Sequence, residues 1–257
     1  MNDYGTFYHS TARRQYAIKI WLREFFATWK QPHALAALLD ELPRGARVLD
    51  VGSGQGSLPE KLAQYRPDLE IVAFDLAPAG QGRGYAWVAG DACRLPFQDG
   101  RFQLVLCRHV IEHIPEAMRM VHELERVLAV DGRLYLDCPD VRSAMSWSPL
   151  NFWEDPTHLR PYTPAGLQRV FELGGMTALK TGRVRDWRLV LFGVFYLPVA
   201  VVARDRFFRR HWLANLFGIF IYGVAAKRRV PLKAAEAVPD AGRGSRPRRG
   251  PRRATRA

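Results

Sequence analysis

The chain has 257 residues, 48% of them hydrophobic, and a net charge of +13 at pH 7. This amount of apolar material predicts one main globular domain with a substantial core. The segment 227–257 holds eleven Lys and Arg but only two acidic side chains, so it carries +9 of the charge and leaves +4 for the segment 1–226. The excess charge lies mostly in a tail, which argues against a globular domain that binds nucleic acid.

Three cysteines, Cys93, Cys107 and Cys138, show neither C-x-x-C spacing nor an even number. Each lies in an apolar, strand-like context, which favours buried thiols in a reducing compartment. We expect no metal site. Lys19 and Arg23 interrupt the apolar stretch near the N-terminus, which argues against a signal peptide and favours a cytoplasmic protein.

Strand and helix patterns alternate along the chain. We expect an amphipathic helical cap within residues 1–34, after which Pro32 opens a second helix. Further helices are expected after Ser57, which can act as the N-cap, and at residues 115–132 and 163–175. Strands are expected at residues 46–51, 69–75, 85–91, 102–107, 133–138, 176–184 and 216–228. This order predicts a doubly wound, mostly parallel α/β sheet that binds its ligands beyond the carboxyl ends of its strands.

The stretch "VLDVGSGQG" joins the first expected strand to a helix. Its glycines, Gly52, Gly54 and Gly56, form G-x-G-x-G, and Ser57 stands where the dinucleotide motif has its last glycine. Asp50 lies two residues before the turn, where a carboxylate would repel a pyrophosphate but attract an ammonium group. The ligand of this turn is therefore expected to be partly cationic.

With this motif the sequence resembles the class I S-adenosylmethionine-dependent methyltransferases over about residues 35–182. The resemblance implies a Rossmann-like sheet of seven strands with an antiparallel last strand, and S-adenosyl-L-methionine as cofactor. It implies that Asp75, which closes "IVAFD", accepts hydrogen bonds from the ribose hydroxyls. It also implies that Asp91 and the Ala92 backbone contact the adenine. The expected cofactor-binding residues are Asp50, Gly52, Gly54, Gly56, Asp75, Leu76, Asp91, Ala92 and Arg108.

Methyl transfer to a hydroxyl acceptor requires a group that takes up the proton, and histidine suits that role. His109 and His113 follow the fourth expected strand, while Asp155 and His158 lie in the loop "NFWEDPTHLRPYTP" after the fifth. We expect His158 to be the base, with Asp155 beside it and His109 as the other candidate. His113 is expected to be a structural histidine at the start of a helix. "DPTH" could instead be a turn that caps the helix at Pro164.

The loop segment "DPTHLRPYTP" is also similar to a segment of bacterial methyltransferases associated with surface-polysaccharide assembly. The expected function is thus methyl transfer to a small-molecule acceptor, a hydroxyl of a sugar or of a lipid-linked glycan. A quinone or other polyprenyl lipid is the alternative acceptor. A catalytically silent cofactor-fold protein that serves as a membrane or complex partner is the alternative that is not an enzyme.

The C-terminal third departs from a minimal methyltransferase pattern. Besides the core, at residues 35–186, we expect an apolar and basic insertion at residues 187–215, a last strand at residues 216–229 and a disordered basic tail at residues 230–257. The apolar run Leu189 to Ala203 is short for a membrane span and contains Pro198, and arginines and aromatic residues follow it. Peripheral binding to an anionic membrane and a helical cover over the sheet are equally compatible with this pattern.

Overall fold

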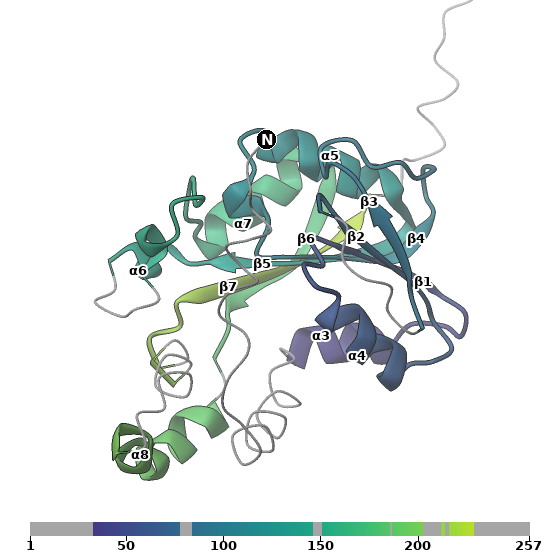
Figure 1. The fold of residues 1–257 in the computed structure, drawn as a ribbon. Helices are drawn as coiled ribbons and strands as arrows, with labels where there is room; N and C mark the ends of the chain where they lie inside the picture. The colour runs from purple at the N-terminus through teal and green to yellow at the C-terminus, as the bar shows by residue number, and fades with distance from the viewer. Residues whose placement is uncertain are drawn as a thin grey trace, which may run out of the picture.

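The structure is a computed structural model that describes residues 33–77, 84–145, 151–185, 187–202, 212–213 and 216–228. Seven strands form one sheet in the order β3-β2-β1-β4-β5-β7-β6 (Figure 1). The strands are β1 (Arg47–Val51), β2 (Glu70–Asp75), β3 (Ala86–Ala89), β4 (Phe102–Arg108), β5 (Leu128–Pro139), β6 (Met176–Arg183) and β7 (Phe220–Lys227). The α-helices are α3 (His33–Asp40), α4 (Ser57–Tyr65), α5 (Ala117–Val127), α6 (Val141–Ala144), α7 (Pro164–Leu173) and α8 (Trp187–Val202). Two short 3-10 helices are η1 (Ile111–His113) and η2 (Phe152–Glu154).

The first five strands pair in parallel, and β7 runs antiparallel to both β5 and β6. The predicted Rossmann-like sheet of seven strands, mostly parallel with an antiparallel last strand, is therefore confirmed. In the parallel part the carboxyl ends of neighbouring strands meet at one edge, so the residues that follow β1, β2, β3, β4 and β5 are brought together there.

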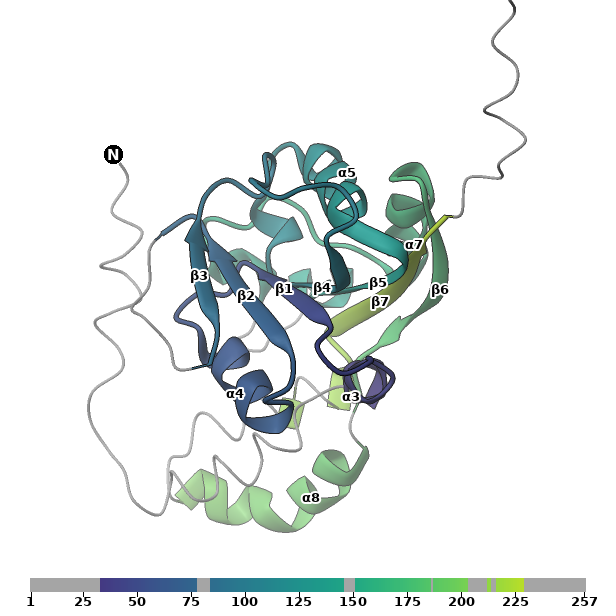
Figure 2. The same cartoon turned by 90° about the vertical axis from the view of Figure 1, so that its right-hand side faces the viewer.

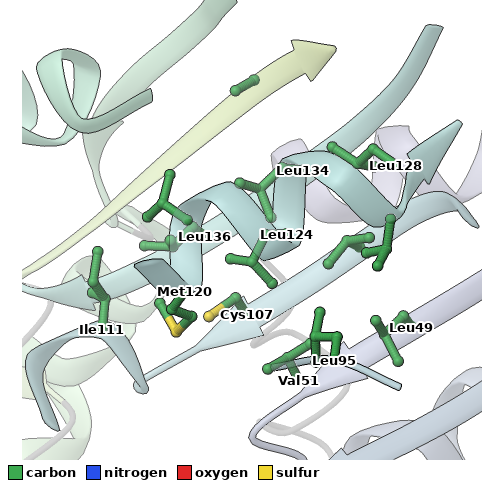
Figure 3. Packing of buried hydrophobic residues seen from close by; sticks show 14 of the residues in the cluster. Leu49, Val51, Leu95, Cys107, Ile111, Met120, Leu124, Leu128, Leu134 and Leu136 are labelled. Atoms are coloured by element: carbon green, nitrogen blue, oxygen red, sulfur yellow. The ribbon is translucent and has the colours of Figure 1, made fainter. Parts of the chain in front are cut away.

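Helices cover both faces of the sheet (Figure 1). Leu49 of β1 packs in the cluster beneath α5 and α7, whereas its neighbour Val48 packs in the cluster of α3 and α4, because successive strand residues point to opposite faces. Figure 3 shows Met120 and Leu124 of α5 against Cys107 of the sheet. Burial on both faces explains why the strands are almost wholly apolar, and it gives the carboxyl edge a close-packed base.

Two predicted helix ends differ from the structure. Helix α5 ends at Val127, not at Gly132, because Leu128 already pairs in the sheet and the side-chain ammonium of Lys227 donates to carbonyl oxygens at the end of the helix. Helix α4 is preceded by Gly56 in a left-handed conformation, and Ser57 is its first residue instead of its N-cap. Both cases reflect tertiary contacts or backbone conformation that local propensity does not encode.

Several predicted segments are only partly described. The N-terminal helical cap lies in residues 1–34, of which 33–34 are described, and the basic tail at residues 230–257 lies outside the described residues. Of the insertion at residues 187–215, α8 contains most of the apolar run, with Pro198 inside it. Figures 1 and 2 place α8 beyond α3 and α4, on the same side of the sheet. No helix in the described ranges is long and apolar enough to cross a membrane.

Candidate active site

The glycine turn lies between the end of β1 and the start of α4. Gly52, Gly54 and Gly56 all have left-handed backbone conformations, with φ of 75°, 57° and 79°. An added Cβ would lie 2.1 Å from the Val110 side chain at Gly52 and 2.1 Å from the Tyr85 hydroxyl at Gly56. At Gly54 it would meet no described atom within 4 Å. The first and last glycines therefore permit tight packing, and the middle one exposes the backbone to a ligand.

Asp75 ends β2 directly beside this turn. Its Oδ2 accepts a hydrogen bond from the Gly54 backbone N–H at 2.8 Å, and its Oδ1 accepts from the Ala77 N–H at 3.3 Å. Each carboxylate oxygen can accept a second hydrogen bond, so Asp75 is oriented by the turn and keeps acceptor capacity for a diol such as ribose. Leu76, the next residue, is 74% exposed.

Asp91 and Ala92 follow β3, the next strand along this edge. The Asp91 Oδ1 accepts a hydrogen bond from the Cys93 backbone N–H at 2.8 Å, which closes a local turn and leaves the side chain exposed. Because β1, β2 and β3 are neighbours, the three predicted carboxylates Asp50, Asp75 and Asp91 follow one another across the edge. This arrangement fits an elongated ligand with an ammonium group, a ribose and an adenine.

Asp50 is almost completely buried, with 2% of its surface exposed. Burial raises its pKa to about 7; Arg108 opposes this shift, and the negative charges of Asp137 and Asp75 add to it. Arg108 is itself engaged, because its Nε donates to Asp137 Oδ2 at 2.7 Å. Arg108 is thus held beside Asp50 by a residue of β5, and the excess negative charge suits a cationic group of the ligand.

His109 follows β4 with a left-handed backbone, φ 53°, and its N–H donates to the Asp137 carbonyl oxygen at 2.9 Å. Its Nδ1 lies 3.3 Å from Glu112 Oε1 and its Nε2 lies 3.8 Å from Asp137 Oδ1. Burial alone would lower the pKa of His109, but the nearby Glu112 and Asp137 raise it above the ordinary value. The ring is 44% exposed, so it is accessible at the edge.

His158 and Asp155 are brought to the same region by the loop after η2. His158 Nδ1 lies 2.7 Å from the Phe152 carbonyl oxygen, and its Nε2 lies 3.9 Å from Asp155 Oδ2. The ring stacks on Phe152 and lies 4.7 Å from the His113 ring, centroid to centroid. The DPTH turn does not cap α7, because the Thr163 side chain does so by accepting from the Gly166 N–H.

The structure adds three polar residues that the sequence analysis did not include, Glu112, Asp137 and Thr157. Asp137 is 3% exposed and pairs with Arg108, and Glu112 is completely buried next to His109. An acidic residue inside the apolar strand "RLYLDC" was a detectable signal for Asp137. Glu112 and Thr157 had no such signal, because η1 and the loop after η2 contact each other only through the tertiary fold.

The sheet order, the glycine turn and the acidic strand ends together define a class I S-adenosylmethionine-dependent methyltransferase. A family model described as a methyltransferase domain matches residues 14–181, and the chain belongs to that family. The predicted class is confirmed, and S-adenosyl-L-methionine is its cofactor. Asp50, the glycine turn, Asp75 and Asp91 are the residues that would hold it.

Known proteins resemble parts of this chain. A demethylmenaquinone methyltransferase of Deinococcus radiodurans is 35% identical over 118 residues, which cover 42% of this chain and 48% of the relative. The chain thus spans about half the length of this relative. A putative sarcosine dimethylglycine methyltransferase from Galdieria sulphuraria matches with a TM-score of 0.58 at 16% identity, covering 79% of this chain and 86% of that one.

A phosphoethanolamine N-methyltransferase 2 of Haemonchus contortus, solved with S-adenosyl-L-methionine, matches with a TM-score of 0.58 at 15% identity. The match covers 78% of this chain and 53% of that one. At these identities the two solved structures show a shared fold only. The acceptors in their names belong to those two proteins and are not assigned to this chain.

Replacing Asp75 by Ala should weaken binding of S-adenosylhomocysteine by about 1.5–3 kcal/mol, because a charge-assisted bidentate contact to the ribose is lost. Calorimetric titration measures this change. Glu70→Ala is the matched control, since Glu70 is an exposed acid at the opposite end of the same strand. Equal binding by Asp75→Ala and Glu70→Ala would contradict the assignment of Asp75.

Binding of S-adenosylhomocysteine should also depend on pH through Asp50. Since the pKa of this carboxyl is raised to about 7, it is mostly neutral at pH 6 and mostly ionised at pH 8, where it attracts the ligand ammonium. We expect affinity to rise about tenfold from pH 6 to pH 8. Asp50→Asn should bind weakly and lose this dependence, whereas Asp75→Asn should bind weakly but keep it. An unchanged pH dependence in Asp50→Asn would refute the role.

Proposed function

We propose that the protein transfers a methyl group from S-adenosylmethionine to a hydroxyl oxygen of a small-molecule acceptor, a sugar or a lipid-linked glycan. The bound cofactor supplies the methyl group on a sulfonium. As the oxygen–carbon bond forms, the carbon–sulfur bond breaks, S-adenosylhomocysteine leaves and the hydroxyl proton must be taken up by the protein. The chain therefore needs a proton acceptor at the carboxyl edge and a loop that orients the acceptor.

The observation that carries this proposal is the placement of His109 between two carboxylates at the end of β4. Nε2 of this ring, whose side chain is 44% exposed, is the atom that would accept the proton, and Asp137 Oδ1 at 3.8 Å would stabilise the resulting imidazolium. The left-handed backbone at His109 is a strained conformation for a residue with a side chain, as often occurs at functional sites. The geometry thus favours His109 over His158 as the base.

The loop of His158 and Asp155 is proposed to line the acceptor side of the site. The backbone N–H of Leu159 donates to the Glu112 carbonyl oxygen at 2.8 Å, which ties the loop to η1. The Arg160 guanidinium donates to the Pro115 carbonyl oxygen at 2.7 Å, and Trp153 is 59% exposed. An ordered loop with polar and aromatic side chains suits an oxygen-rich acceptor such as a sugar.

A quinone or another polyprenyl lipid is the second candidate acceptor. It is favoured by the similarity to demethylmenaquinone methyltransferases, of which a second, from Thermus thermophilus, is 31% identical over 116 residues. This similarity lies in less than half of the chain, at 41% coverage. A lipid-linked glycan and a quinone share one requirement, which is access to a membrane surface.

Exposed apolar side chains on α8 support peripheral contact with an anionic membrane. Leu191, Val194, Phe195 and Val202 are 65%, 59%, 82% and 86% exposed. This apolar surface, together with the basic sequence from residue 227 onward, supplies the two signals that stable peripheral anchoring requires. Such contact would place the enzyme next to a lipid-linked acceptor.

Replacing His109 by Ala should lower turnover by about 10²-fold or more and leave S-adenosylhomocysteine affinity nearly unchanged, because only the proton acceptor is lost. Turnover is measured with labelled methyl donor on nucleotide-sugar, glycolipid and quinol acceptors. His122→Ala, an exposed histidine on α5, is the control and should be as active as wild type. Unaltered turnover of His109→Ala would show that His109 is not the base. Cofactor binding without turnover on every acceptor would favour the catalytically silent alternative.

The protein should sediment with anionic liposomes at low salt. The contribution of the basic tail is tested with a chain that ends at Arg228, because a cut before Lys227 would also remove the end of β7. This shortened chain should sediment less than the full-length chain. Salt at 1 M shortens the Debye length to about 3 Å and should remove the electrostatic share only. The salt-resistant fraction should decrease in a Phe195→Ser variant. If the full-length chain stays in the supernatant at low salt, the proposal of membrane contact is wrong.

A further inference from the structure

Glu112 and His113 of η1 and His158 of the facing loop form a compact group of three potential metal ligands. One ligand atom from each residue lies within 4.8 Å of the other two. The two segments that carry these residues are joined by a backbone hydrogen bond, in which the Leu159 N–H donates to the Glu112 carbonyl oxygen. The three side chains come from two segments that are far apart in the sequence, so the fold itself gathers them.

The hydrogen bonds around His113 determine which ring nitrogen is available. Its Nδ1 lies 2.8 Å from the Thr157 hydroxyl, and that hydroxyl donates its single proton to Asp155 Oδ1 at 2.6 Å. His113 Nδ1 must therefore be the donor to Thr157, and the lone pair of the neutral ring lies on Nε2.

His158 is oriented in the same way by a different acceptor. Its Nδ1 can only donate to the Phe152 carbonyl oxygen at 2.7 Å, so its lone pair also lies on Nε2. The ring stacks on Phe152 with centroids 4.4 Å apart and planes at 26°. In proteins, a histidine that binds a metal almost always donates its other ring N–H to a carbonyl or carboxylate, directly or through another group. Both rings are arranged for that use.

Glu112 brings a buried carboxylate to this group. Its side chain is completely buried, and neither carboxylate oxygen has a hydrogen-bond partner in the part of the chain that the structure describes. His109 Nδ1 lies 3.3 Å away but outside hydrogen-bond geometry. A buried carboxylate is costly unless it is paired or coordinates a metal, and a metal ion would supply the partner that the Glu112 oxygens lack.

We propose that Glu112, His113 and His158 bind a divalent transition-metal ion of the first row, with Asp155 and Thr157 as the residues that position His113. Two imidazoles and one carboxylate suit Zn²⁺, Fe²⁺ or Mn²⁺, and three protein ligands leave a coordination position open. Metal–ligand bonds of about 2.1 Å require a spacing of about 3.4 Å between ligand atoms, so the three side chains would have to move closer together on binding. From the sequence we expected no metal site. The site shares Glu112 with the surroundings of His109 and His158 with the proposed acceptor side, but metal binding is measured without methyl transfer.

Metal binding is tested on the full chain without a histidine tag, stripped with chelator and titrated with Zn²⁺ against a chromophoric competitor. Wild type should bind one equivalent of Zn²⁺ tightly. Co²⁺ bound in its place should give the visible absorption of a site with a low coordination number. His113→Ala and His158→Ala should weaken Zn²⁺ binding by about 100-fold or more. Thr157→Val, which keeps all three ligands, should weaken it by about 10- to 100-fold, because His113 loses its orienting partner.

His122→Ala is the matched control and should bind Zn²⁺ as wild type does, since His122 is exposed on α5 and lies outside the group. Circular dichroism verifies that each variant is folded. If a ligand variant does not fold, Thr157→Val decides the question. The proposal is overturned if wild type binds Zn²⁺ no more tightly than the ligand variants do. It is also overturned if Thr157→Val binds Zn²⁺ as tightly as wild type. Both results hold whether or not the enzyme methylates an acceptor.

Discussion

The parallel pairing of β1 with β2 and β4 is the constraint on which the site depends. Asp50 of β1 lies in register with Ala73 of β2 and with Leu106 of β4, so the three strands end at nearly the same level. Both faces of these strands are covered by helices, and the packing leaves their ends no freedom to slide. Asp50, Asp75 and His109 lie at this edge because their strands end there.

Acidic residues that are concentrated at one edge repel one another. Neighbouring positive or N–H groups offset this repulsion more for some of these residues than for others. Asp137 is compensated by Arg108, and Asp75 is held by backbone N–H donors of its own surroundings. Asp50 and Glu112 are buried with less compensation. Uncompensated buried carboxylates are typical of binding sites, where a ligand supplies the missing positive charge. For Asp50 that charge would be an ammonium group, and for Glu112 a metal ion.

Local pattern was sufficient for much of the fold and for locating the residues expected to hold the cofactor. The strand, glycine turn and helix around Gly52 to Gly56 are contiguous in sequence, and Asp75 follows at the end of the next strand, so spacing alone places them. The end of α5 was missed because a lysine of β7, the last strand of the chain, caps the helix. From the sequence we expected His158 to be the base, whereas we now propose His109, because the choice depends on which carboxylates surround each ring.

The sequence by itself determined the class of fold, because hydrophobic periodicity and short-range spacing are local properties, and its resemblance to a known family implied the cofactor and the carboxylates expected to hold it. The tertiary structure alone decided that Glu112, His113 and His158 share one site and that Asp137 holds both Arg108 and the His109 backbone. These contacts join η1 to the loop after η2, and β4 to β5. They depend on how the loop packs over the sheet edge, which no pattern within a single element encodes.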